Sequence, residues 1–468
     1  MANEVKTVNS IAIANIKNLN GITDSNLKNF NGEEFTGSVS PTAFTVTNYQ
    51  FNSGRSWGTE LAWDPDTDTL IVMYGDDGNG DYPTYRLGKL SANTGDITIT
   101  WQNEEALSSA GAGYHQKPVY DTGNDRMGLI FLESGADSSN RYRIAFGTIS
   151  NSGSTPSMSV GTHETIHATS AGNYNQGDVS SLAIYWSEMG AIVTALEYGD
   201  DDNDANFVKA FKVNTSDNSV ITSGNNELMF ADTSGEFYQM VYDEDIGRIV
   251  IFSLQSPSST NTIFGNILDF DSSSTNGLTL ELEHSLPGTS LFLASAGKSY
   301  DMGEWGCYNT SANIHHLLIT ETSDSTKKIR NVKISGSDGS FTMDPHTTYA
   351  LDIPSSRDDY TTIWFNQVRG LMGTAGTDGT SSSGVAVKAL GYTFTEDTGT
   401  EANSTFTANG SEQTLVISNH NTYYGRYLSF PVISSQSDMH TGNLGAIMSF
   451  YGGSRTNEGV IVGFDTGG

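Results

Sequence analysis

The sequence is poor in cysteine and has no long apolar run, and each shortage excludes a class of protein. A single cysteine, Cys307, among 468 residues excludes an intramolecular disulfide framework and fits a protein made in a reducing cytoplasm. We expect Cys307 to be a small buried hydrophobic residue. Because no run of about 18 apolar residues occurs, we also expect no membrane-spanning helix.

Basic charge is also scarce. The 23 basic residues face 54 acidic residues, which gives a formal charge of −31. Such a chain would be repelled by phosphate backbones and anionic membranes, so we expect neither nucleic acid nor membrane as a partner. The first 21 residues lack the apolar core of a secretory signal. A composition suited to an exposed surface, without an export signal, fits a protein released by cell lysis.

What the sequence does contain is a repeat of strand and turn patterns. LAWDPDTDTLIVMY at 61–74 combines two apolar runs with an acidic turn, and related stretches follow down the chain. The aromatic residue before each turn recurs every 56 to 66 residues, at Trp63, Tyr120, Tyr185, Tyr242, Tyr308 and Trp364. A period of this length indicates a repeat architecture.

Each repeat is predicted to contain four strands. In the first, these lie at 60–63, 70–74, 85–90 and 97–101, and the second is a continuous apolar run typical of a strand buried on both faces. Four-stranded sheets repeated around an axis form a β-propeller. The fold class is therefore all-β.

The two ends of the chain determine the number of blades. Residues 444–464 match strands two and three of the second repeat, and only four residues follow them. The candidate for the missing fourth strand of a seventh blade is residues 42–51, TAFTVTNYQF. We predict a seven-bladed β-propeller over 39–468, closed by strand 42–51; six blades plus a small β-domain is the alternative.

Residues 1–38 form a separate N-terminal segment. NIKNLNG at 15–21 and NLKNFNG at 26–32 repeat after eleven residues, with apolar residues three apart. Because Asn-Gly often ends a helix, we predict two short helices, each too short to be stable alone. Their apolar residues would anchor the segment to a partner: Ile16, Leu19, Leu27 and Phe30.

This pattern resembles terminal regions of structural proteins from tailed bacteriophages, notably marine ones, which carry paired Ile-x-Lys-x-Asn-Gly segments. The match covers about 30 residues, and here Lys17 and Lys28 are followed by Asn-Leu-Asn and Asn-Phe-Asn, which departs from the tightest family form. The resemblance implies a virion component whose N-terminal segment packs on another virion protein. An ordinary extension that packs on its own domain is the alternative.

Two histidine motifs contain residues that can bind metal or catalyse, but both fall in predicted strands. His163-Glu164-Thr165-Ile166-His167 has the H-E-x-x-H spacing of zinc proteases, which requires a helix. It falls where the second blade needs its fourth strand, and histidines four apart in a strand are about 13 Å apart, so we predict no zinc site. His315 and His316 lie in a predicted strand, with their rings on opposite faces.

Acidic loops are the better metal candidates. Asp77, Asn79 and Asp81 alternate as in the first half of a calcium loop, although Tyr82 replaces the required glycine and no Glu completes the motif. A second acidic loop follows at 199–206. Calcium is thus the one candidate cofactor, and turn formation with solvation is the simpler interpretation.

Together these patterns predict a non-enzymatic structural component of a tailed-phage virion. It would be a tail or capsid-decorating appendage that displays the propeller for host-surface contact, in multiple copies per particle. Its partners would be other virion proteins, through residues 1–38, and host glycans. It would be made in the host cytoplasm and released by lysis. The alternative function is an extracellular bacterial propeller that binds or cleaves glycans.

Overall fold

The described part of the chain is built almost entirely of β-strands. The computed structural model describes residues 7–8, 11–12, 18–19, 22–23, 29–30, 33–34, 46–53, 56–93, 96–111, 116–134, 140–151, 155–168, 181–198, 205–222, 226–231, 235–255, 262–283, 289–293, 306–320, 327–337, 340–350, 361–366, 371–378, 384–397, 404–418, 446–451 and 459–464. Within these ranges there is no α-helix. Two three-residue 3-10 turns, Asp77–Asn79 and Thr275–Gly277, lie in connections between strands.

The first three blades are antiparallel sheets in chain order, each with a short extra strand on the third strand. Blade 1 contains β8 (Ser56–Asp64), β9 (Thr69–Asp76), β10 (Tyr82–Asn93), β11 (Asp96–Trp101) and β12 (Glu105–Ala106). Blade 2 contains β13 (Lys117–Asp121), β14 (Arg126–Ser134), β15 (Asn140–Ser150), β16 (Ser157–Val160) and β17 (Glu164–Ala168). Blade 3 contains β18 (Ser181–Trp186), β19 (Ala191–Tyr198), β20 (Ala205–Asn214), β21 (Ser219–Ile221) and β22 (Glu227–Ala231).

The next three blades follow the same order. Blade 4 contains β23 (Gly235–Asp243), β24 (Arg248–Gln255), β25 (Thr262–Asp271), β26 (Thr279–Leu282) and β27 (Thr289–Leu293). Blade 5 contains β28 (Gly306–Asn309), β29 (Ile314–Thr320), β30 (Lys327–Ser335) and β31 (Thr342–Ala350). Blade 6 contains β32 (Thr361–Asn366), β33 (Leu371–Asp378), β34 (Gly384–Thr395) and β35 (Thr405–Ser418).

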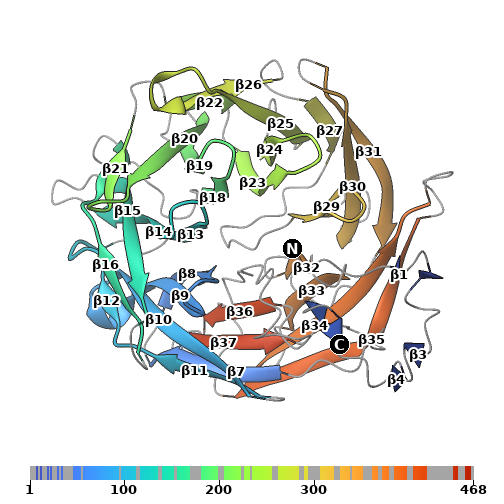
Figure 1. Ribbon diagram of the computed structural model, residues 1–468, viewed down its shortest axis with the longest axis horizontal. Coiled ribbons are helices and arrows are strands. Elements are labelled where there is room, and N and C mark those ends of the chain that lie inside the picture. Colours follow the sequence, from blue (N-terminus) through green and yellow to red (C-terminus); the bar gives the residue numbers. More distant parts are fainter. Residues whose placement is uncertain are drawn as a thin grey trace.

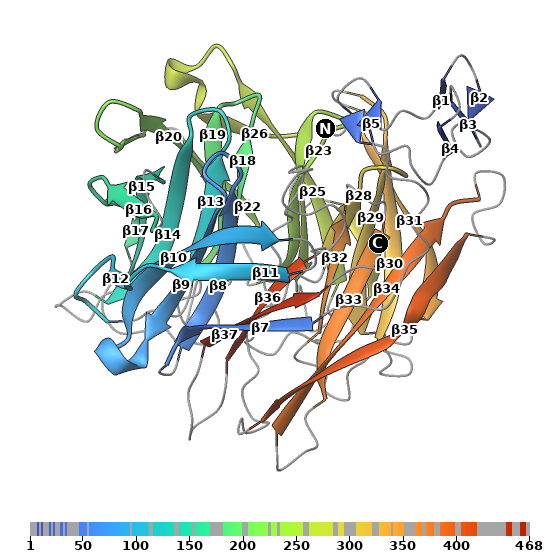
Figure 2. The same ribbon diagram turned by 60° about the horizontal axis from the view of Figure 1, so that its bottom comes forward.

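The seventh sheet joins the two ends of the chain. Its described strands are β36 (Ala446–Tyr451), β37 (Gly459–Phe464) and β7 (Val46–Asn52), in that order. The sheets stand in a ring about a common centre, and β7 lies beside β37 next to blade 1 (Figures 1 and 2). The predicted all-β propeller fold is confirmed. Strand β7 contains residues 46–51 of the closing strand predicted at 42–51, and residues 42–45 lie outside the described residues.

The hydrophobic core is distributed among the seams between neighbouring blades. One buried cluster joins Val193 and Ala195 of blade 3 to Ile249 and Ile251 of blade 4, and others join blades 1 and 2 and blades 2 and 3. Because second strands are covered on both faces, their central residues are mainly apolar, as in β9, which is buried along its whole length. Burial of each such apolar side chain stabilises the folded state by about 1.5–3 kcal/mol.

In five blades, the hairpin between the first and second strands ends in the same backbone conformation. Its last residue is left-handed in each, with φ between 52° and 65°, and the residues are Asp68, Asp125, Gly190, Gly247 and Asn313. Asp, Asn and Gly tolerate this conformation best, which explains why these turns are rich in them.

The outermost strand is broken at the same level in every described blade from 1 to 6. In blades 1 to 4 it consists of two pieces that both pair with the third strand. In blades 5 and 6 its register against the third strand shifts, opposite Arg330 to Val332 of β30 and opposite Ala389 to Gly391 of β34. Interrupted edge strands discourage pairing with other chains. The ring therefore presents poor templates for edge-to-edge association.

The short helices predicted in residues 1–38 are not what the described residues form. They form three two-stranded ladders: β1 (Thr7–Val8) with β2 (Ile11–Ala12), β3 (Asn18–Leu19) with β4 (Ile22–Thr23), and β5 (Asn29–Phe30) with β6 (Glu33–Glu34). Each pair is separated in sequence by two residues, Asn9-Ser10, Asn20-Gly21 or Asn31-Gly32. Asn-Gly between apolar residues is a strong signal for a two-residue β-hairpin, and it outweighs the helix-stop interpretation here.

Candidate functional site

The acidic loop of blade 1 places its three candidate calcium ligands in different backbone settings. Asp77 and Asn79 are exposed and belong to a 3-10 turn, in which residues two apart are rotated by about 240° around the axis. Asp81 follows in the left-handed region, with φ of 58°. Within the described residues no three His, Cys, Asp or Glu side chains are grouped as a metal site would require. Calcium binding by this loop stays a prediction.

The buried carboxylate of this loop is Asp76, which precedes the predicted ligands. Its Oδ1 accepts hydrogen bonds from Gly78 N at 3.1 Å and from Asn52 Nδ2 at 3.4 Å. Burial, and then the charge of Glu104, raise the pKa of Asp76. Since Asn52 ends β7, this carboxylate connects the closing strand to blade 1 and has a structural role.

The repeated tyrosines seen in the sequence cross the seams. The hydroxyl of each donates to a carboxylate in the hairpin of the preceding blade: Tyr120 to Asp66 at 2.7 Å, Tyr242 to Glu188 at 2.8 Å, and Tyr308 to Asp243 at 2.9 Å. Tyr185 bonds to Asp121 in the same way. Burial, and then the nearby carboxylates, raise the pKa of Tyr185 and of Tyr242 to about 12. The acidic hairpins therefore hold neighbouring blades together.

A second set of contacts uses the scarce basic residues. At the hairpin end of the second or third strand, a basic side chain reaches the next blade: Lys89 to Asn151 Oδ1 at 2.9 Å, Arg126 to Asn218 Oδ1 at 2.7 Å, Lys212 to Asn276 O at 2.6 Å, and Lys333 to Glu396 Oε1 at 2.6 Å. Sequence reasoning missed these residues. A signal was present, because Lys89, Lys212 and Lys333 all lie on the third strand of their repeats, and Arg126 begins the second strand of its repeat.

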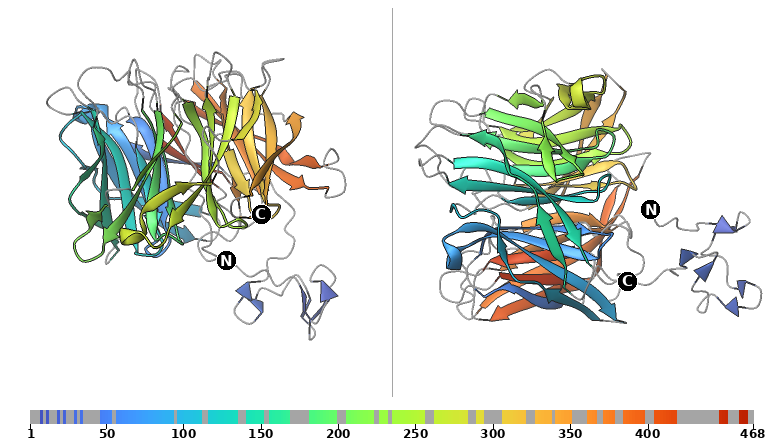
Figure 3. Two further views of the ribbon diagram at one scale, coloured as in Figure 1. Left: turned by 90° about the horizontal axis from the view of Figure 1, so that it is seen from above. Right: turned by 60° about the vertical axis from the view of Figure 1, so that its left-hand side comes forward.

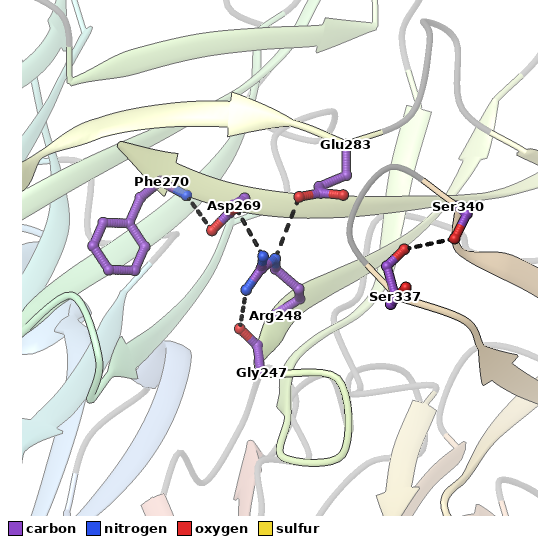
Figure 4. Close-up of polar contacts among 7 residues, drawn as sticks. All are labelled: Gly247, Arg248, Asp269, Phe270, Glu283, Ser337 and Ser340. Atoms are coloured by element: carbon purple, nitrogen blue, oxygen red, sulfur yellow. Dashed lines mark hydrogen bonds and ion pairs between the residues drawn. The ribbon is translucent and has the colours of Figure 1, made fainter. Parts of the chain in front are cut away.

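Arg248 begins the second strand of blade 4, as Arg126 does in blade 2, and it contacts carboxylates of its own blade (Figure 4). Its Nη2 is 2.8 Å from Asp269 Oδ2 and its Nε is 3.5 Å from Glu283 Oε1. Burial raises the pKa of Asp269, and a hydrogen bond with Glu283 raises it further. Carboxyl groups in hydrogen-bond contact are closer than the roughly 5 Å that a glycosidase pair needs. The cluster fits a structural role. In a separate loop of blade 5, Ser340 Oγ donates to Ser337 O at 3.0 Å (Figure 4).

The two histidines of β29 face opposite seams, as predicted. His315 is fully buried, its Nε2 is 3.1 Å from Asp243 Oδ2, and its ring packs against Phe252 of blade 4. His316, also fully buried, packs against Phe394 of blade 6. Burial lowers the pKa of both rings, that of His316 to about 4. Tyr, Asp and His thus meet in one place, but without exposure to a substrate.

The H-E-x-x-H motif is in a strand, as the sequence predicts. Glu164 to His167 belong to β17, and His163 precedes it, with its ring 5.1 Å from that of Phe131. The helical geometry of a zinc protease is therefore absent from this segment.

The anchor residues are only partly within the described residues. Leu19 is in β3 and Phe30 is in β5, whereas Ile16 and Leu27 lie outside the described residues, as does the acidic loop 199–204. Cys307 is buried, as predicted. Within the described residues, no helix is long and apolar enough to cross a membrane.

Comparisons with known proteins assign no family. No family model matches the chain, and no curated protein matches it. Similar solved structures include a glucose dehydrogenase (12% identity, 70% of this chain, 96% of that one, TM-score 0.41) and AofleA from Arthrobotrys oligospora (10%, 81%, 94%, 0.39).

A third similar structure is Trypanosoma rangeli sialidase in complex with the inhibitor DANA (10% identity, 90% of this chain, TM-score 0.40). This chain matches 60% of the length of the sialidase. Since identities are 10 to 12% and the scores are near 0.4, none of these three likenesses assigns an activity to the chain.

Proposed function

We propose that this chain is a non-enzymatic structural component of a tailed-phage virion, a tail or capsid-decorating appendage that displays a β-propeller for host-surface contact. The observation that carries the proposal is the N-terminal segment. Its six short strands form three pairs, and among the described residues no strand of a blade pairs with them. The strands β1 to β4 lie outside the ring (Figure 3). Such a segment has the form of an attachment element, and its described strands belong to no sheet of the propeller.

The titratable groups of the described residues have structural roles, which supports a function in displaying a surface. The titratable clusters, at Asp76, Asp243 and Arg248, hold strands and blades together and are mostly buried. The partners of residues 1–38 would be other virion proteins, and the strong acidity of the ring opposes binding to nucleic acid. The particle would carry several copies, released with it by lysis of the host.

The test compares the full chain with a chain that begins at residue 39, using phage particles assembled without this protein. We expect only the full chain to co-sediment with the particles, and both chains to show the same thermal unfolding. If the truncated ring unfolds, the segment is part of the propeller and the proposal loses its support. Host polysaccharide cleaved by the isolated propeller would favour the glycan-active alternative.

A further inference from the structure

Blade 5 differs from the other described blades at two buried positions of its second strand. His315 and His316, on β29, are fully buried. Apolar side chains would fill these positions without the cost of burying a titratable ring. Pairing with the first strand identifies the corresponding residues of blades 1 to 4 and 6, which are apolar or glycine: Leu70 and Ile71, Met127 and Gly128, Ile192 and Val193, Ile249 and Val250, and Met372 and Gly373.

His316 is held in its neutral form by two amides. Asn309 Oδ1 accepts hydrogen bonds from Ser311 N at 3.1 Å and from Ala312 N at 3.2 Å. These bonds fix the amide, so that its Nδ2 group faces His316 Nε2 at 3.3 Å. Since an amide nitrogen only donates, Nε2 must accept, and Nδ1 carries the ring proton and donates to Asn331 Oδ1 at 2.7 Å. A second proton on this ring would place one donor against another.

The turn residue Asn309 occupies the position that aspartate has in blades 1, 2 and 4. There the Oδ1 atoms of Asp64, Asp121 and Asp243 accept from the backbone nitrogen two residues further on, as Asn309 Oδ1 does. An amide makes the same turn bond and also donates to His316. An aspartate would instead accept from the ring and favour its charged form. The turn of blade 5 is therefore suited to a neutral histidine.

His315 is also unsuited to a second proton. Its Nε2 donates to Asp243 Oδ2 at 3.1 Å, whereas its Nδ1 has no hydrogen-bond partner among the described residues. The ring packs against Phe252 and stacks on Tyr308. Burial opposes the charged ring more than Asp243 favours it, so the pKa of His315 is lowered. Burial also lowers the pKa of His316, to about 4.

The charged and titratable groups on the elements packed around the two rings differ between the seams. Around His315 they are Asp243, Glu244, Asp245 and Arg248 of blade 4 and Tyr308 and Arg330 of blade 5. Around His316 they are Cys307, Lys333 and Asp344 of blade 5 and Tyr392 and Glu396 of blade 6. Lys333 Nζ donates to Glu396 Oε1 at 2.6 Å, so these two charges pair with each other across the seam.

From this geometry we propose that blade 5 is an acid-sensitive gate of the ring, which opens when protonation of His315 and His316 loosens it from blades 4 and 6 together. The two rings pack against Phe252 of blade 4 and Phe394 of blade 6, so both seams of one blade weaken at the same time. The inference concerns the ring itself and does not rest on the proposed function.

The direction of the pH dependence follows from the two states. In the opened blade the rings reach water, and their pKa returns toward about 6.5. The closed form is therefore fully favoured above about pH 6.5. As the pH falls below this value, the opened form binds protons that the closed form does not, and its population rises by up to about tenfold per pH unit for each ring.

Cys307 is a natural probe of the gate, because it is the single cysteine, is buried, and lies opposite His316 in the ladder of β28 and β29. Its rate of reaction with dithiodipyridine is measured on the full chain at pH 7.5 and pH 5. Each rate is divided by that of the guanidinium-unfolded chain at the same pH. We expect this ratio to be at least about tenfold higher at pH 5. An unchanged ratio would overturn the proposal.

A matched probe in blade 2 separates opening of the gate from general acid unfolding. Val119 pairs with Gly128 as Cys307 pairs with His316, so Val119→Cys in a Cys307→Ser chain reports on blade 2. Its ratio should change far less between the two pH values. An equal rise for both probes would show that acid loosens the whole ring, and the gate would then be wrong.

Two substitutions test the assigned chemistry. Asn309→Asp retains the turn found in blades 1, 2 and 4 but offers His316 an acceptor, and His315→Met introduces the residue that blades 2 and 6 have at this position. Each should reduce the acid response of Cys307 several-fold, and thermal unfolding at pH 7.5 verifies that both variants fold. A full acid response in both variants would contradict the roles of the two rings.

Discussion

At the scale of single residues, the protein uses its few basic side chains as links between blades. Lys212 lies on β20 of blade 3 and donates to the Asn276 carbonyl of blade 4, 64 residues away. Arg86 donates to the Phe51 carbonyl on the closing strand and to Gln102 O at 2.6 Å. Because backbone carbonyls are the acceptors in several of these contacts, the acceptor residue is free to vary between repeats.

Replacing Lys212 with Met should weaken the seam between blades 3 and 4. The methionine retains most of the apolar stem but cannot donate to Asn276 O, and we expect a loss of about 1 kcal/mol in the free energy of unfolding. Urea denaturation would measure it. Lys6→Met, in the N-terminal segment 1–38, is the control and should have little effect. An equal loss in both variants would refute a specific seam contact.

The buried His316 makes stability depend on pH. Its Nδ1 is 2.7 Å from Asn331 Oδ1, and burial lowers its pKa to about 4. The unfolded state, with a pKa near 6.5, therefore binds the proton first. This contribution to stability is complete above about pH 6.5 and is lost as the pH falls toward 4, by up to about 1.4 kcal/mol per unit.

The comparison of wild type with His316→Asn isolates this effect from the many carboxylates. We expect the advantage of the wild type, measured by urea midpoints, to be smaller at pH 5 than at pH 7.5. A difference that does not change between these two pH values would show that the histidine does not titrate in this way.

At the scale of elements, the closing strand β7 is the most instructive. Phe51 is fully buried, with its ring 5.1 Å from that of Tyr74 and 6.4 Å from that of Trp101, both in blade 1. The strand therefore pairs with β37 by its backbone and with blade 1 by its side chains.

Phe51→Ala should weaken the packing of the closing strand β7 against blade 1. Truncation of a fully buried phenylalanine costs about 3–5 kcal/mol, and here the cavity lies between the seventh sheet and blade 1. Gln50→Ala, an exposed neighbour on the same strand, should cost less than about 0.5 kcal/mol. Hydrogen exchange should show faster opening of β37 and β7 in the Phe51 variant only, and uniform exchange in both variants would contradict this role.

The strands that could be predicted are those whose signals are local. The apolar second strands and the acidic hairpins are visible in the sequence because burial on both faces and left-handed turn residues restrict composition at each position. The N-terminal ladders were predicted wrongly, since Asn20-Gly21 suits both a helix end and a hairpin, and only the backbone pairing of Leu19 with Ile22 distinguishes them.

At the scale of the whole molecule, ring closure could be predicted by counting strands, whereas the seams could not. The contacts of Arg126 with Asn218 and of Tyr308 with Asp243 join residues 92 and 65 positions apart. Which charged residue meets which partner depends on how neighbouring sheets face each other. A sequence without structure therefore reveals the blades but not the links between them.

The position of β7 has a mechanical consequence. The N-terminal segment enters the ring at Val46, and β7 then pairs with β37 through six registered positions that end at Asn52. A force applied to the segment would run along the strand, so that all six positions resist together in shear and none opens before the others. The buried ring of Phe51 lies at the far end of this ladder, where it would act as a stop against sliding.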